Sequence, residues 1–165
     1  MSPSAHQRRI DASGLQFLQE LEGLQNGAYC DSGGQLTIGI GHLLTPSERH
    51  SGKIVLGGEG VPYRHGLTDD QCRSLLRQDL EPVEDAINST VEVPLIQRQY
   101  NALVAFVLNV GVNAFLKSTL LRLLNQGHYS EVPPQLLRWV MDNGRVVPGL
   151  VNRRHREIAM WMQKG

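Results

Sequence analysis

The sequence predicts an α+β fold, in which a small mixed lobe is joined by a long helix to a larger, all-helical lobe. Turn residues and a short apolar alternation occupy residues 24–44, as in a small β-hairpin, whereas helical periodicity dominates after Pro94. The chain has 165 residues, which suits a single domain spanning 1–165. We place the mixed lobe at 13–67, the connecting helix at 68–93 and the helical lobe at 94–165.

Capping and turn residues mark the elements of the N-terminal part. Asp11 or Ser13 can cap a first helix, on which leucines recur at three-residue steps, and Gly23 can end it. The hairpin comes next. Residues 45–66 then contain five glycines and two prolines, so we expect a loop-rich segment with one further strand at 53–56.

Thr68 opens the long helix. The segment TDDQ has the form of a capping box, because Gln71 can reach back to the Thr68 amide. Pro82 lacks an amide hydrogen and should kink this helix or end it early. After Pro94 we expect helices only, at Leu95 to Val110, at Ser118 to Gln126, from Pro133 and Pro134 onward, and at Val151 to Gln163.

Composition argues against several partners. The chain carries 16 basic and 16 acidic side chains, so its formal net charge is zero and we expect no nucleic-acid partner. No run approaches the ~18 apolar residues of a membrane span, so we expect no membrane insertion. The N-terminal stretch MSPSAHQRRIDASG lacks the apolar core of a secretory signal, which predicts retention in the cytoplasm where the chain is made.

The two cysteines, Cys30 and Cys72, lie far apart and show no metal-ligand spacing. We therefore expect free thiols and no metal site. Cys30 stands next to Asp31 and is a conceivable nucleophile. Nothing in the sequence resembles a thiol-protease signature around it, so we interpret it as a small, partly buried side chain.

The segment EGLQNGAYCDSGGQLTIGIGH, residues 22–42, concentrates chemically useful groups. Glu22 falls at the end of the first helix, where the negative end of the helix dipole favours the protonated acid. Asp31 lies in the turn before the Ile-Gly alternation. If the isoleucines point inward, Thr37 faces open space across Gly39 and Gly41, and a bulky ligand can approach the backbone there.

An acid, a candidate base and a hydroxyl around one groove suit glycoside hydrolysis, in which two carboxylates flank the scissile bond. The spacing alone is equally compatible with a structural role, because Asp-Ser-Gly-Gly is favourable turn chemistry and Ile-Gly alternation occurs in ordinary hairpins.

Several blocks of the sequence, in order, resemble one family. The pattern Glu-x8-Asp-x5-Thr followed by IGIGHLL is similar to that of the phage-type lysozymes, glycoside hydrolase family twenty-four. The resemblance continues through LTDDQCRSLLRQDL, VPLIQRQYNALVAFVLNVG, AFLKSTLLRLLNQG and LLRWVMDNGRVVPGLVNRR, over roughly residues 15–161. It implies a lysozyme-like fold and an enzyme that cleaves the β-1,4 bond between N-acetylmuramic acid and N-acetylglucosamine in bacterial peptidoglycan.

The resemblance also implies roles for single residues. Glu22 matches the catalytic acid, Asp31 the second carboxylate and Thr37 the threonine that positions water, in an inverting reaction without a cofactor. Inversion requires carboxyl groups about 6.5–9.5 Å apart. The family positions that line the sugar groove match Leu43, Leu108 and Ser118, each of which could equally be core, whereas Pro133 stands where a polar groove residue is expected.

Three charged positions follow from the same resemblance. His42 should pair with Asp79, unless it is an ordinary structural histidine. Arg153 or Arg154 is the candidate for an arginine near the catalytic acid. The structural interpretation of the run NRRHRE is a solvated basic face.

Two alternatives remain open at this stage. A lytic transglycosylase would cut the same bond with a single acid, although it would need no activated water and hence neither Asp31 nor Thr37. A non-catalytic glycan-binding or tail module would tolerate loss of all three polar groups. The resemblance favours a monomeric phage endolysin, held in the host cytoplasm until a holin opens the inner membrane and then acting on the periplasmic cell wall.

Overall fold

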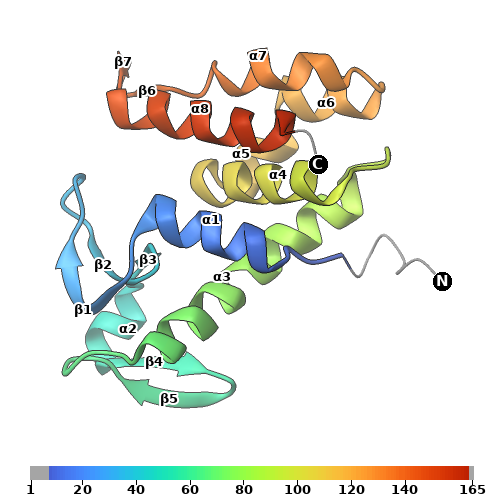
Figure 1. The fold of residues 1–165 in the computed structure, drawn as a ribbon. Coiled ribbons are helices and arrows are strands. Elements are labelled where there is room, and N and C mark those ends of the chain that lie inside the picture. Colours follow the sequence, from blue (N-terminus) through green and yellow to red (C-terminus); the bar gives the residue numbers. More distant parts are fainter. Residues whose placement is uncertain (1–7, 164–165) are drawn as a thin grey trace. The chain divides into compact units, whose positions relative to one another are not determined.

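The computed structural model describes residues 8–163, and these form two compact units. One unit comprises the residues up to Leu15 together with those from Pro82 onward, and the other comprises Gln16–Glu81. Residues 1–7, which begin the stretch in which we expect no secretory signal, lie outside the described residues. Figure 1 shows helices together with small antiparallel sheets, which confirms the predicted α+β class.

Helix α1, Ala12–Glu22, begins and ends where its sequence predicts. Asp11 is the residue that caps it, because its Oδ1 accepts a hydrogen bond of 3.0 Å from the amide of Gly14. The helix ends at Gly23, which has a φ of 74° and donates its amide to the carbonyl of Gln19. These local signals make Glu22 the last residue of the helix.

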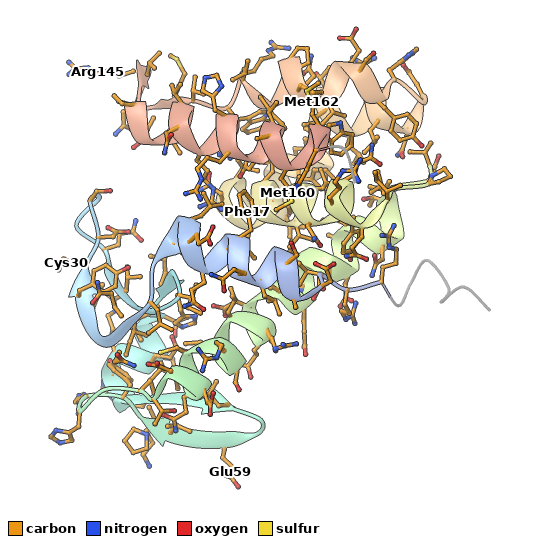
Figure 2. The ribbon with its side chains drawn as sticks, in the orientation of Figure 1. Phe17, Cys30, Glu59, Arg145, Met160 and Met162 are labelled. Carbon is orange, nitrogen blue, oxygen red and sulfur yellow. The ribbon has the colours of Figure 1, made fainter. Side chains whose placement is uncertain are left out.

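The unit Gln16–Glu81 contains two small sheets. Strands β1, Gln25–Cys30, β2, Leu36–Gly39, and β3, His42–Leu43, form an antiparallel sheet with β2 in the middle. Strand β4, Lys53–Leu56, occupies the predicted range and pairs with β5, Glu59–Pro62. Glu59 stands at the turn between these two strands (Figure 2).

Helix α2, Pro46–Ser51, lies within the segment expected to be a loop. The sequence signal for this helix is local, but the sequence reasoning did not identify it. Thr45 and Glu48 form a capping box, in which the Glu48 amide donates to Thr45 Oγ1 over 3.1 Å and the Thr45 amide to Glu48 Oε1 over 2.9 Å. Gly52 ends this helix with a φ of 72°. A short helix therefore separates the two sheets along the chain.

Helix α3, Asp69–Thr90, begins with the predicted capping box. The Thr68 amide donates to Gln71 Oε1 over 2.9 Å, and the Gln71 amide donates to Thr68 Oγ1 over 3.0 Å. Pro82 lies inside the helix, so of the two predicted effects of this proline, a kink or an early end, the early end does not occur. The helix continues because Val83 and Ile87 bury their side chains beyond it, and burial outweighs the lost hydrogen bond.

The other unit is mainly helical. Helix α4, Gln97–Val110, packs against α8, Pro148–Met162, and Figure 1 shows the two side by side. The residues from Tyr100 to Val107 are buried and form the centre of this core. The remaining helical elements are α5, Val112–Leu116, α6, Thr119–Asn125, a 3-10 turn at Tyr129–Glu131, and α7, Val132–Leu136.

The expectation of helices only after Pro94 was wrong at one place. Strands β6, Met141–Asp142, and β7, Arg145–Val146, form a hairpin, and Figure 2 marks Arg145 on it. Asn143 and Gly144 make the turn, with φ values of 50° and 74°. An Asn-Gly pair is a strong signal for such a two-residue turn, and it was available in the sequence.

Candidate active site

Glu22 lies against the turn that follows β2. A Cβ atom added to Gly41 would stand 2.7 Å from Glu22 Oε2 and 3.0 Å from its carboxyl carbon. Gly41 has a φ of 73°, a backbone conformation that favours glycine. Its lack of a side chain also leaves room for the carboxyl group of Glu22. Glu22 is at the end of α1, as the sequence predicts, and its carboxyl group lies against the turn between β2 and β3.

Asp31 stabilises the loop between β1 and β2 through hydrogen bonds within that loop. Its Oδ1 accepts the amides of Gly33 and Gln35 at 2.9 and 2.8 Å, and its own amide donates to the Gln35 carbonyl over 2.8 Å. These bonds hold the carboxyl group in place through the backbone of its own turn. Both side-chain bonds use Oδ1, so the second oxygen is the one that can serve chemistry.

Thr37 is placed differently from the prediction. The residue is only 3% exposed, so it is buried in the sheet and is not the open position that the sequence predicted. The reason is that β2 is the central strand, where Tyr29 and Leu43 stand opposite Thr37 on either side. Its hydroxyl donates to the carbonyl of Gln35 over 3.0 Å.

The predicted strand face across the Ile-Gly alternation also needs correction. Strand β2 ends at Gly39, and Gly41 belongs to the turn before β3. Positive φ values at both glycines make this turn possible. Ile38 and Ile40 are buried as predicted.

Tyr29 is influenced by the charges of both acids, and the sequence reasoning did not identify this residue. Burial raises the pKa of the Tyr29 phenol, and the negative charges of Glu22 and Asp31 raise it further. Both carboxyl groups therefore lie within electrostatic reach of this one phenol. Glu22, Asp31 and Thr37 belong to the same unit, in which Thr37 stands opposite Tyr29 in the sheet.

His42 pairs with Asp79, as predicted. Its Nδ1 lies 2.8 Å from Asp79 Oδ2, and its Nε2 lies 2.9 Å from Glu48 Oε1, a partner that the sequence reasoning missed. Burial opposes a charge on the ring, but hydrogen bonds and charge from Asp79 and Glu48 outweigh burial and raise the pKa of His42 to about 9. The protonated ring can therefore donate to both carboxylates and tie β3 to α2 and α3.

The candidate sugar-binding residues fall in both units. Leu43 on β3 is 49% exposed, which suits a contact residue. Leu108 is half-buried near the end of α4. Ser118 is buried and caps α6, since it accepts the amide of Leu121 over 3.1 Å and donates to the Phe115 carbonyl over 2.6 Å.

Ser118 also lines an open pocket of about 400 Å³. Two cationic residues, Lys117 and Arg138, contribute to the lining, together with Gln135 and Trp139. A pocket with this mixture of positive, amide and aromatic groups can accept a polar or anionic ligand.

The basic run on α8 is not simply a solvated face. Arg153 and Arg154 are buried around Glu157, with Arg153 Nε 3.1 Å from its Oε2 and Arg154 Nη1 2.5 Å from its Oε1. Arg154 also donates to the carbonyl of Trp139 and to Asn109. The solvated interpretation was therefore wrong for these two arginines, because an internal carboxylate partner four or three residues along the helix compensates their burial.

The cysteines are free, as predicted. Cys72 is buried, whereas Cys30 is exposed on the edge strand β1 (Figure 2), so the expectation of partial burial for Cys30 was wrong. Among residues 8–163, no three His, Cys, Asp or Glu side chains are grouped so that they could hold a metal ion. No helix within that range has the length and apolar character needed to cross a membrane.

The chain is similar to several known proteins. The "SAR-endolysin" of Escherichia phage Mu is 39% identical over 150 residues, which cover 91% of this chain and 79% of that protein. The "Endolysin" of Salmonella phage P22 is 38% identical over 154 residues, 93% of this chain and 98% of that protein. The solved "Muramidase domain of SpmX" from Asticaccaulis excentricus is 31% identical with a TM-score of 0.77, covering 96% of this chain and all of that one (100%).

A family model described as "Phage lysozyme" matches residues 19–157. This match contains the two acids, the buried threonine and the histidine ion pairs, as well as the cationic pocket. Since it extends over most of the sequence, the chain belongs to the phage lysozyme family.

Proposed function

We propose that Glu22, Asp31 and Thr37 hydrolyse the β-1,4 bond between N-acetylmuramic acid and N-acetylglucosamine in peptidoglycan. Membership of the phage lysozyme family makes the chain a glycoside hydrolase that acts on peptidoglycan. Two relatives are named endolysins and a third protein is named a muramidase domain, which supports this choice of bond. The observation that supports the residue assignment is geometric: Glu22 lies against Gly41 in the turn after β2, and Asp31 directly follows β1, which pairs with the strand that carries Thr37.

In this mechanism Glu22 gives its proton to the glycosidic oxygen as the bond to the anomeric carbon breaks. The oxygen of a water molecule bonds to that carbon from the opposite face, and Asp31 takes the proton that the water loses. Thr37 holds the water. Its hydroxyl hydrogen is already given to the Gln35 carbonyl, so the hydroxyl oxygen is left to accept a hydrogen from the water.

The geometry expected for inversion can be stated as a distance. The carboxyl groups of Glu22 and Asp31 should lie about 6.5–9.5 Å apart, because water must fit between Asp31 and the sugar. A well-ordered separation near 5 Å would instead indicate a nucleophilic carboxylate and a retaining reaction.

Leu43, Leu108 and Ser118 are the proposed sugar contacts. The exposure of Leu43 supports its assignment, and Ser118 gains support from the pocket that it lines, in addition to its capping role. We further propose that the protein works as a monomer without inserting into a membrane. By the same family likeness it is released from the host cytoplasm through a holin and reaches the wall in the periplasm.

The experiment is mass spectrometry of the products released from purified peptidoglycan by wild type, Glu22→Gln and Asp31→Asn. Reducing muramic ends from wild type, with both variants nearly inactive, would establish a two-carboxylate hydrolase. Anhydro ends that require only Glu22 would identify a lytic transglycosylase. Binding of glycan without any cleavage would identify a non-catalytic module and would overturn the proposed mechanism.

A further inference from the structure

A row of three side chains crosses the sheet beside the two acids. The register places Tyr29 on β1 opposite Thr37 on β2, and Thr37 opposite Leu43 on β3. Residues directly opposite in antiparallel strands point to the same face, so the three side chains lie side by side. Thr37 and Leu43 already have proposed roles in water and sugar binding, whereas Tyr29 has none.

Tyr29 occupies the β1 end of this row, within electrostatic reach of both carboxyl groups. Asp31 follows it by two residues, immediately after β1, and is held there by its loop amides. The charges of Glu22 and Asp31 add to burial in raising the pKa of Tyr29. The phenol therefore remains protonated at neutral pH and is available as a hydrogen-bond donor.

The hydrogen bonds around the attacking water leave a place for such a donor. Asp31 accepts one hydrogen from the water and Thr37 accepts the other, since the Thr37 hydroxyl already donates to Gln35. The water oxygen then has one lone pair for the anomeric carbon and one lone pair left over. Neither ionised Asp31 nor Thr37 can donate to that lone pair.

We propose that the Tyr29 hydroxyl donates a hydrogen bond to the attacking water and is a further catalytic residue of this enzyme. The proposal rests on the proposed function, because it requires a hydrolase that activates water. Tyr29 keeps its proton throughout. The water oxygen bonds to the anomeric carbon, the bond to the glycosidic oxygen breaks, Glu22 supplies one proton and Asp31 receives the other.

The proposal assigns the catalytic role to the hydroxyl of Tyr29 and not to its ring. If the ring served as a packing surface for a sugar, phenylalanine would replace tyrosine with little loss. If the hydroxyl positions water, phenylalanine should lower the rate of the chemical step and leave substrate binding intact.

The test measures kcat and KM for Tyr29→Phe on soluble peptidoglycan fragments, by release of reducing ends. Tyr63→Phe is the matched control, because Tyr63 is a buried tyrosine in the same unit and its substitution removes the same atom. We expect Tyr29→Phe to lower kcat by roughly 10- to 100-fold, with KM within about twofold of wild type, whereas Tyr63→Phe keeps wild-type kcat. Thermal unfolding of both variants identifies any loss caused by instability.

Two outcomes would overturn the proposal. Wild-type kcat in Tyr29→Phe would show that the hydroxyl is dispensable, and a raised KM with unchanged kcat would make it a sugar contact. Glu22→Gln and Asp31→Asn are assayed in parallel, so that failure of the proposed function is seen separately. Activity of Asp31→Asn, or anhydro products, would show that the reaction does not use a water activated by Asp31.

Discussion

The Nδ1 atom of His42 lies 2.8 Å from Oδ2 of Asp79, so that strand β3 is joined to helix α3 by a partly buried ion pair. The pKa of His42 is raised to about 9, above the value of about 6.5 in an unfolded chain. The folded state therefore binds this proton more tightly than the unfolded state does. The resulting stabilisation is complete below about pH 6.5 and is lost as pH rises through about 9.

Asp79→Asn should lower the free energy of unfolding at pH 5.5 by about 1–3 kcal/mol, because it removes one charged partner from His42. The difference between variant and wild type should shrink as the pH rises through about 9. Urea denaturation at several pH values measures this. Equal stability of the two proteins at pH 5.5 would contradict the prediction.

Glu48→Gln tests the second partner of His42. Glutamine can still accept the Thr45 amide and so preserves the capping box of α2, while the charge near His42 is lost. We expect a smaller stability loss than for a variant that also breaks the cap, such as Glu48→Ala, and a lower His42 pKa. An NMR titration of the ring gives that pKa directly, and an unchanged value would exclude Glu48 as a partner in solution.

Gly41→Ala should reduce activity at least tenfold, because the new methyl group would stand 2.7 Å from Glu22 Oε2 and displace the acid. The left-handed backbone adds about 1–2 kcal/mol of destabilisation. Gly57→Ala is the control, since Gly57 also has a positive φ but has nothing within 4 Å of an added Cβ. If both variants lose activity equally, backbone strain and not Glu22 displacement is responsible.

Glu157→Gln should destabilise the protein by about 3–5 kcal/mol, because two buried guanidinium groups would lose their carboxylate partner. Chemical denaturation measures the loss. Glu131→Gln removes an exposed carboxylate from the same unit and should change stability by no more than about 0.5 kcal/mol. A comparable effect of the two substitutions would mean that the buried cluster contributes little.

Arg138→Ala tests whether the pocket beside Ser118 binds part of the substrate. Peptidoglycan carries carboxylates on its peptide stems, which the positive charge of Arg138 would attract. We expect KM to rise roughly two- to fivefold, with kcat unchanged and a weaker effect at high salt. Arg122→Ala removes an exposed positive charge from α6 outside this pocket, and an equal rise in its KM would point to general charge attraction instead.

Sequence reasoning succeeded where the determining interaction is local. The boundaries of α1 follow from Asp11 and Gly23, and the start of α3 follows from Thr68 and Gln71, because each signal is contained within one helical turn. The Asn143-Gly144 turn was equally local and was overlooked.

Predictions were wrong where burial depends on distant segments. Thr37 is buried because β3 pairs with β2 on its far side, and no property of TIGIG itself reveals this. Arg153 and Arg154 are buried because α8 packs against α4, which a charge count along α8 cannot show. The role of Glu48 required α2 to bring its carboxylate to His42.

The hydrogen bonds that Asp31 makes within its loop matter for the design of an inactive variant that still binds the cell wall. Oδ1 of Asp31 accepts hydrogen bonds from the amides of Gly33 and Gln35, and these bonds hold the turn. Replacing Asp31 by alanine would remove both bonds and loosen the turn. Asparagine keeps an oxygen in that position and removes the basicity. Under the proposed mechanism, a wall-labelling reagent made from this chain should therefore carry Asp31→Asn, because the alanine variant would lose its loop geometry as well as its activity.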